Sequence, residues 1–291
     1  MTTLLLLLGY GDTLITASLL EQAGAAASGI RIVGTGLVPR VAEVMRHPIR
    51  VDEVIFDEMP AFYTVKKRGI RAALADIQAF RRWSQTGLAA GSTVVFEREP
   101  KLRNRALVAG RGCRLVEVAK QDTAYADRAR VLSALLGCDI ALPPAPLGAS
   151  PARSLLINPS SRVPAKALSP AVVERLTRQA RAAGVDVVLI DVDGEYAGLR
   201  SQVSEYQLKP RLADAVATLR RVDRYLGPDS FFLHLAYYYR IPALAFFADD
   251  NHYFRPPGLF ESGAGMYLRD LDDQALIEQK LVWFLGRQRN D

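Results

Sequence analysis

Four short polar segments of the chain carry side chains that could bind and activate a charged substrate, and each follows an apolar run. The first segment is Gly9-Tyr10-Gly11-Asp12. The other three are residues 158–166, 191–195 and 227–230, which hold Ser160, Ser161, Lys166, Glu195, Asp229 and Ser230. Because loops that follow the strands of a parallel sheet collect at one edge, we expect these side chains to line a ligand site.

The residue types in these segments suit a phosphorylated substrate. Asp12 could act as a general base toward a hydroxyl, although a carboxylate at a helix start could equally be an N-cap, and capping is the commoner role. Serine hydroxyls and the Lys166 ammonium are donors suited to phosphate oxygens. Glu195 could accept hydrogen bonds from the two hydroxyls of a ribose.

Residues 223–247 carry a sequence pattern typical of an anion site. The pattern predicts a strand end, a tight turn at Gly227-Pro228 and a helix capped by Asp229 or Ser230. The N–H groups and the positive dipole end at such a helix start favour phosphate, although many α/β proteins have this turn with nothing bound. His234 falls one turn into the helix, where a single histidine is more often packed than catalytic.

The elements that must position these loops alternate between apolar strands and helices. Strands are expected at 4–8, 30–34, 51–56, 92–97, 114–118, 154–158, 185–190, 224–226 and 243–247, and helices at 13–26, 39–45, 69–83, 124–136, 170–183, 212–221 and 229–239. This alternation predicts parallel sheets covered on both faces. An uncharged, Pro-rich stretch at 142–151 is typical of a linker.

We therefore predict an α/β protein with two Rossmann-like domains that face each other across a cleft. The N-terminal domain would cover residues 1–145 and the C-terminal domain residues 146–291, with the last helix packing back on the first domain. The apolar run at 4–8 is too short for a signal peptide or a membrane span. Cys113 and Cys138 are too few for a disulfide framework, which favours a cytoplasmic protein.

The formal net charge of +6 is concentrated in one region. Residues 60–114 hold twelve Lys or Arg residues against Asp76, Glu97 and Glu99. This excess predicts an anionic partner, whether a phosphorylated glycan, an anionic lipid surface or a nucleic acid, or else a solvated basic face. Nucleic acid is disfavoured because no RNA-binding or helix-turn-helix signature accompanies the charge.

In the helix at 69–83, the spacing predicts that Ile70, Ala73, Leu74, Ile77 and Phe80 line the buried face.

Several motifs together resemble the heptosyltransferase family of bacterial glycosyltransferases (family nine), which has the two-domain GT-B fold. Gly9-Tyr-Gly-Asp12 and the apolar residues after it resemble the family's first turn. Asn158 to Lys166 resembles its lysine loop, Gly194-Glu195 its nucleotide-contacting Gly-x-Glu, and Asp229-Ser230-x-x-x-His234-Leu-Ala its motif Asp-Ser/Thr-Gly-x-x-His-Leu-Ala. The segments at 241–247 and 254–258 resemble those that follow in the family. Three positions depart from the pattern. Phe231 replaces the motif's glycine, Leu168 replaces the tryptophan of the lysine loop, and the basic residue usually found just before the first turn is absent, since the apolar run at 4–8 leads directly into Gly9.

The resemblance implies inverting transfer of a heptose or similar sugar from a nucleotide-diphosphate donor, typically ADP-linked, to a lipopolysaccharide core or other bacterial surface glycan. Asp12 would deprotonate the acceptor hydroxyl. The donor site would comprise Ser160, Ser161, Lys166, Glu195, Asp229, Ser230, Phe231 and His234, and the acceptor site Tyr10, Lys66, Lys67 and Arg68. No metal and no cofactor would be required, because a lysine and a helix dipole can stabilise the leaving diphosphate.

Phe231 and the altered lysine loop leave an alternative open, a diverged and non-catalytic homologue that binds a nucleotide or glycan within a glycan-assembly pathway. Either protein would work in the cytoplasm, in peripheral contact with the inner membrane, and would not bind nucleic acid.

Overall fold

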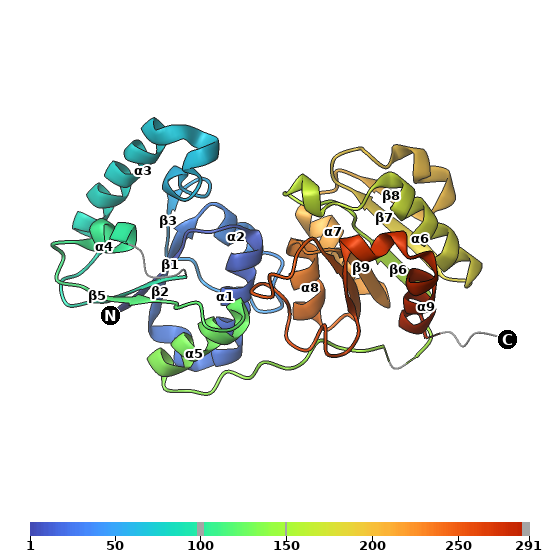
Figure 1. Cartoon of the computed structure of the whole chain (residues 1–291). Coiled ribbons are helices and arrows are strands. Elements are labelled where there is room, and N and C mark those ends of the chain that lie inside the picture. Colours follow the sequence, from blue (N-terminus) through green and yellow to red (C-terminus); the bar gives the residue numbers. More distant parts are fainter. Residues whose placement is uncertain (98–101, 149, 287–291) are drawn as a thin grey trace. The chain divides into compact units, whose positions relative to one another are not determined.

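The computed structural model describes residues 1–97, 102–148 and 150–286, and it divides into two compact units (Figure 1). The first unit spans Met1–Leu142 and the second Pro143–Asp291. Each unit contains its own sheet and its own apolar core.

The first unit is built on a five-stranded sheet in the order β3-β2-β1-β4-β5. Its strands are β1 (Thr2–Leu6), β2 (Ile30–Thr35), β3 (Glu53–Phe56), β4 (Thr93–Phe96) and β5 (Arg114–Glu117). Its helices are α1 (Tyr10–Ala23), α2 (Leu37–Ala42), α3 (Val65–Gly87), α4 (Leu102–Val108) and α5 (Ala124–Leu136), with short 3₁₀ turns η1 (Gly24–Gly29) and η2 (Ala61–Tyr63). β1 is central because Leu4, Leu5 and Leu6 are apolar on both faces and are no more than 1% exposed.

The second unit is built on a six-stranded sheet in the order β11-β10-β9-β6-β7-β8. Its strands are β6 (Ser154–Ile157), β7 (Asp186–Asp191), β8 (Glu205–Leu208), β9 (Arg224–Pro228), β10 (Ala243–Phe247) and β11 (Gly265–Tyr267). Its helices are α6 (Pro170–Ala182), α7 (Leu212–Arg221), α8 (Phe231–Tyr239) and α9 (Gln274–Phe284), with 3₁₀ turns η3 (Pro164–Lys166), η4 (Ala197–Gln202) and η5 (Leu268–Asp272). The last helix contributes Ile277, Leu281 and Phe284 to the core of this unit.

Every strand pairing described in the two sheets is parallel. The predicted α/β class with two Rossmann-like units is confirmed. In a parallel sheet all carboxyl ends meet at one edge, so the loops that follow the strands of each unit are neighbours. None of the described helices is both long and apolar enough to cross a bilayer.

The predicted linker at 142–151 begins where the two units divide, and its residues from Pro143 onward are held by side chains of the second unit. The Tyr237 hydroxyl donates to the Pro143 carbonyl oxygen at 2.5 Å, and Arg240 Nη1 donates to the Pro144 carbonyl oxygen at 2.7 Å. Further along, Arg224 Nη2 donates to the Ser150 carbonyl oxygen at 2.5 Å. Proline cannot donate a backbone hydrogen bond, but its carbonyl accepts, and this allows side chains of α8 and β9 to hold the segment.

The predicted buried face of helix α3 is partly wrong. Ala73 and Phe80 are buried as expected, but Ile70 is 69% exposed and Leu74 is 54% exposed. Gly69 has φ +82 and separates the first turn from the remainder of the helix. The buried side of α3 is therefore a narrower stripe than the apolar spacing indicated.

Candidate active site

Asp12 lies in the first turn of α1, just beyond the carboxyl end of β1. The helix begins at Tyr10 with Gly9 as its N-cap, three residues earlier than the sequence predicted. Asp12 is therefore the third helical residue, and the alternative that it caps the helix is wrong. A carboxylate in the first turn is still favoured by the helix dipole.

The Asp12 carboxylate is held by a buried arginine that the sequence analysis did not identify. Arg128, on α5, is 2% exposed, and its Nη2 donates to Asp12 Oδ1 at 2.6 Å. Its Nη1 donates to the Asp12 main-chain carbonyl oxygen, also at 2.6 Å. The side chain of Asp12 is 14% exposed. Among the described residues, no hydrogen bond is donated to Asp12 Oδ2.

A second carboxylate, Glu97, lies behind this pair at the end of β4. Glu97 Oε1 is 4.0 Å from Arg128 Nη1 and accepts a hydrogen bond from the Thr16 hydroxyl at 2.6 Å. Its side chain is 1% exposed. A buried guanidinium requires opposite charge, and two carboxylates around it give the cluster a formal charge of −1. Asp12 is the member of this cluster that reaches solvent.

The predicted acceptor residues lie in two places within the first unit. Tyr10 opens α1, and its hydroxyl accepts a hydrogen bond from Arg40 Nη1 at 3.4 Å. Lys66 and Lys67 are exposed on the first turn of α3. Of the other basic residues between 60 and 114, Arg98 and Lys101 lie outside the described residues, as does the acidic Glu99.

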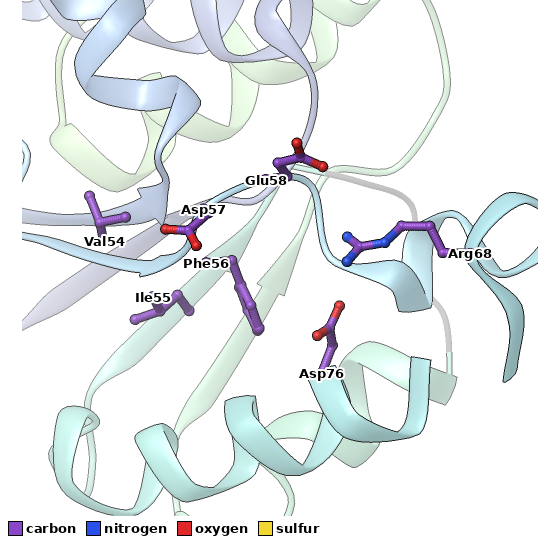
Figure 2. A pocket seen from close by; sticks show the side chains of 7 residues that line it. All are labelled: Val54, Ile55, Phe56, Asp57, Glu58, Arg68 and Asp76. Atoms are coloured by element: carbon purple, nitrogen blue, oxygen red, sulfur yellow. The ribbon is translucent and has the colours of Figure 1, made fainter. Parts of the chain in front are cut away.

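Arg68 borders a cavity at the carboxyl end of β3 (Figure 2). The cavity has a volume of about 490 Å³ and is lined by Val54, Ile55, Phe56, Asp57, Glu58, Arg68 and Asp76. Figure 2 shows the guanidinium of Arg68 and the carboxylate of Asp76 pointing toward one another. Arg68 Nη1 also donates to the Met59 carbonyl oxygen at 3.1 Å. Three of the six residues that share this cavity with Arg68 are acidic, namely Asp57, Glu58 and Asp76.

In the second unit, three of the predicted loops follow adjacent strands, β9, β6 and β7. Lys166, in the loop after β6, donates from its Nζ to Asp229 Oδ2, in the loop after β9. Their side chains are 28% and 12% exposed. The structure thus brings together two residues that the sequence placed in one site from separate segments.

The loop that carries Glu195 is shaped by the buried Asp191. Asp191 Oδ1 accepts from the Gly194 N–H at 2.7 Å, and its Oδ2 accepts from the Tyr196 N–H at 2.9 Å and the Tyr206 hydroxyl at 2.6 Å. Burial acts to raise the pKa of Asp191, but these hydrogen bonds outweigh it and the pKa is lowered. Glu195 is exposed at the outside of this loop.

Tyr196 links the Glu195 loop to the lysine loop. Its hydroxyl donates to the Leu168 carbonyl oxygen at 2.6 Å, and burial raises the pKa of Tyr196 to about 12. Leu168, which stands where the resembling family has tryptophan, is buried in the core under the loop. The three loops are therefore one connected structure.

Gly227 allows the turn after β9 to pass close to the loop after β6. A Cβ at this position would lie 2.5 Å from the Asn158 carbonyl oxygen and 2.3 Å from the Tyr225 hydroxyl. Burial raises the pKa of Tyr225 above its usual range, and the neighbouring Ser230 hydroxyl partly opposes this shift.

Two serine hydroxyls at this junction are unsatisfied. Ser160 Oγ and Ser230 Oγ are buried, and neither forms a hydrogen bond of good geometry with the described residues. Ser230 is the N-cap of α8 but does not cap it with its side chain. Buried hydroxyls rarely lack a partner. Ser230 lies at the start of α8, where the first N–H groups of the helix favour an anion. Ser161 differs, because its Oγ accepts from the Val163 N–H at 3.3 Å in a local turn.

Phe231 is the first residue of α8 and needs no special backbone conformation. Among the described non-glycine residues only Lys209 and Arg240 have positive φ. The ring of Phe231 is half-buried and meets Phe232 edge-to-face at a centroid distance of 6.1 Å. His234 is 5% exposed inside the unit, which favours the packed role over direct contact with a ligand.

Neither Arg128 nor Glu97 was predicted as a site residue. Glu97 could have been predicted in the same way as the four polar loops, because it is a charged residue that directly follows the apolar strand ending at Phe96. Arg128 carried no such signal, because it is one of several arginines in a helix. Within the part of the chain that is described, no group of three or more His, Cys, Asp or Glu side chains is arranged to hold a metal ion.

No protein-family model and no curated protein sequence matches the chain. Solved structures do match. Escherichia coli heptosyltransferase WaaC with ADP superposes with a TM-score of 0.64 at 15% identity, covering 96% of this chain and 100% of that chain. The glycosyl transferase family 9 structure from Veillonella parvula gives a TM-score of 0.63 at 14% identity, covering 96% and 89% of the two chains. E. coli ADP-heptose lps heptosyltransferase II gives 0.55 at 14% identity, covering 98% of both chains.

The chain therefore has the GT-B fold of the family-nine heptosyltransferases, as the resemblance in its motifs predicted. At these identities the likeness establishes the fold.

Proposed function

We propose that this chain is an inverting glycosyltransferase that moves a heptose or similar sugar from a nucleotide-diphosphate donor to a bacterial surface glycan, such as a lipopolysaccharide core. The observation that carries the proposal is the junction of three loops after β9, β6 and β7, where Lys166 meets Asp229 beside the start of α8. The likeness in fold to an ADP-bound heptosyltransferase supports it.

The donor diphosphate would bind at the start of α8. The unsatisfied hydroxyls of Ser160 and Ser230 and the first N–H groups of the helix would donate to its oxygens. Lys166 would supply the positive charge that stabilises the diphosphate as it leaves. The exposed carboxylate of Glu195 would accept the ribose hydroxyls, and we propose adenine as the base.

Asp12 would serve as the general base. The acceptor hydroxyl oxygen attacks the anomeric carbon from the face opposite the diphosphate, the carbon–oxygen bond to the diphosphate breaks, and the hydroxyl proton passes to Asp12 Oδ2. The electron pair of the broken bond leaves with the nucleoside diphosphate. We propose that Lys166 and the helix start stabilise that charge without a metal or a cofactor.

On the acceptor side, Tyr10, next to Asp12 in the first turn of α1, and the exposed Lys66 and Lys67 are the proposed contacts to an anionic glycan. Arg68 would contribute through the cavity at β3. We propose a cytoplasmic site for the reaction, where nucleotide sugars are made, which agrees with two cysteines that form no disulfide.

The alternative is a homologue that binds the nucleotide without transferring sugar. Two observations favour it: Phe231 stands where the resembling family has glycine, and Asp229 already neutralises Lys166. It differs from the first proposal in turnover and not in donor binding.

The deciding experiment combines binding and turnover. The full chain is titrated with ADP, GDP, UDP and TDP by calorimetry, then incubated with ADP-heptose and other nucleotide sugars and with deacylated lipopolysaccharide core, and products are followed by mass spectrometry. We expect ADP binding and a glycan heavier by one sugar, with turnover lowered about 10²–10⁴-fold in Asp12→Asn. Nucleotide binding without product would favour the non-catalytic alternative, and absence of nucleotide binding would refute the transferase and leave only a homologue that binds glycan.

A further inference from the structure

Helix α3 carries most of the net charge of the chain. Its basic residues are Lys66, Lys67, Arg68, Arg71, Arg81 and Arg82, and its acidic residue is Asp76. Six positive charges and one negative give the helix a formal charge of +5, against +6 for the whole chain. A field concentrated on one element favours contact with an anionic surface.

The same helix exposes large apolar side chains next to these charges. Ile70 and Leu74 are 69% and 54% exposed and lie one turn apart. Arg81 continues the same strip two turns later, since positions i, i+4 and i+11 share a face of an α-helix. Arg71 is exposed beside the strip.

The opposite side of α3 anchors the helix to the first unit. Phe80 is fully buried, and Trp83 packs against the same core and donates from its Nε1 to Glu53 Oε1 at 2.8 Å. Figure 1 shows α3 at the edge of its unit, beyond β3 and next to α4. The exposed strip is therefore held on a helix that is firmly packed through its other face.

We propose that the exposed side of α3, defined by Ile70, Arg71, Leu74 and Arg81 together with the exposed Lys66 and Lys67 on the turn before Gly69, docks on the surface of an anionic phospholipid bilayer. Basic side chains pair with lipid phosphates, while two aliphatic side chains between them enter the boundary of the acyl chains. The surface shares Lys66 and Lys67 with the proposed acceptor contacts, but this proposal does not rest on the transferase activity, because vesicle binding is measured without donor or acceptor.

The exposed Ile70 and Leu74 favour a bilayer over a nucleic acid as the anionic partner of α3. A phosphodiester backbone would pair equally well with the basic side chains, but Ile70 and Leu74 would remain in water. A bilayer buries both, and the gain grows with the apolar area removed from water.

The test is flotation of the full chain with vesicles of phosphatidylcholine alone and of phosphatidylcholine with phosphatidylglycerol. We expect binding to the anionic vesicles that weakens as salt rises. The triple variant Lys66→Gln, Lys67→Gln, Arg71→Gln should lower the partition coefficient about 100-fold, since each basic side chain contributes about fivefold. The variant Ile70→Ser, Leu74→Ser should lower it at least about tenfold while keeping full solubility, because both side chains lie outside the core.

A matched control removes three exposed charges elsewhere, with Arg50→Gln, Arg211→Gln and Arg269→Gln, whose side chains are 90%, 85% and 61% exposed. It should bind vesicles within about threefold of the unmodified chain, because none of these side chains belongs to the exposed side of α3 and exposed charges are screened at physiological salt. If this control lost as much vesicle binding as the triple variant of α3, net charge alone would explain the effect and the proposal would be overturned. The proposal would also be overturned if the chain did not bind anionic vesicles but bound a short DNA duplex, and if the Ile70→Ser, Leu74→Ser variant bound that duplex equally well.

Discussion

Arg128 holds Asp12 at two points, the carboxylate Oδ1 and the main-chain carbonyl oxygen, each at 2.6 Å. One guanidinium thereby fixes both the side chain and the backbone of the first turn of α1. Glu97, at 4.0 Å on the far side, offsets part of the positive charge. The arrangement orients one carboxylate oxygen of Asp12, Oδ1, toward Arg128.

The first prediction concerns Arg128→Met, which removes the guanidinium but keeps much of its volume. We expect kcat of the proposed transfer to fall about 10–100-fold with little change in the KM for the donor, because misorientation of a base affects the chemical step. The free energy of unfolding should fall by about 3–5 kcal/mol, since the buried Glu97 loses a charge partner. Steady-state kinetics and urea unfolding measure the two effects.

A double-mutant cycle separates positioning from general destabilisation. In an Asp12→Asn background, Arg128→Met should cause no further loss of kcat, because Arg128 acts through the carboxylate. Arg128→Lys keeps the charge but not the two parallel donors and should recover stability more than kcat. Additive losses in kcat would show that Arg128 does not act through Asp12.

The second prediction concerns the diphosphate site. Lys166→Met should weaken ADP binding about 10–100-fold, because it removes a charge-assisted hydrogen bond to phosphate. Asp229→Asn should not weaken ADP binding, since it removes the carboxylate that competes with phosphate for Lys166. Calorimetric titration measures both, with Lys209→Met, an exposed lysine of the same unit, as the matched control. A loss in the control as large as in Lys166→Met would assign the effect to overall charge.

The juxtaposition of Lys166 and Asp229 could be predicted from the sequence. Both follow apolar runs that read as strands, and the parallel topology brings such loops to one edge. The pairing of Arg128 with Asp12 could not, because the two are 116 residues apart and lie on helices. Helical periodicity indicates which side of a helix is buried, but not which distant polar group a buried arginine will meet.

The exposed Ile70 and Leu74 on α3 show a second limit of the sequence analysis, which predicted burial from apolar spacing. Ile70 and Leu74 match the spacing of a buried face together with Phe80, yet they lie outside the core. Apolar spacing alone does not reveal how wide a stripe the neighbouring elements cover, and Gly69 interrupts the helix just before the stripe.

The third prediction concerns pH. The pKa of Asp191 is lowered in the folded state by three hydrogen-bond donors, among them Tyr206 and the Tyr196 N–H. The stabilisation is present above the unfolded-state pKa of about 3.9 and is lost as the pH falls through the lower folded-state value. The pKa of Tyr206 is raised to about 12, so its hydroxyl remains a donor throughout this range.

Urea unfolding of Asp191→Asn tests this linkage. At pH 7 the variant should be less stable by about 1–3 kcal/mol, because an amide cannot accept all three hydrogen bonds. The difference should shrink below about pH 3.9, where the carboxylate of the unmodified chain becomes protonated. Asp193→Asn, an exposed neighbour in the same loop, should change stability by less than about 0.5 kcal/mol at either pH. A constant difference across the pH range would contradict the role of the Asp191 charge.

The last prediction concerns Phe231, the residue that separates the two functional proposals. Its backbone does not require glycine, so Phe231→Gly relieves no strain and should lower the free energy of unfolding by about 1 kcal/mol through helix propensity and lost ring contacts. If the ring packs on the bound donor, the KM for the nucleotide sugar should rise while kcat changes little, because ground-state and transition-state binding are lost together. Phe231→Leu retains apolar volume at this position and should keep most of the affinity. A gain in turnover on Phe231→Gly would show instead that the ring obstructs the site, and it would favour the nucleotide-binding, non-catalytic form of the protein.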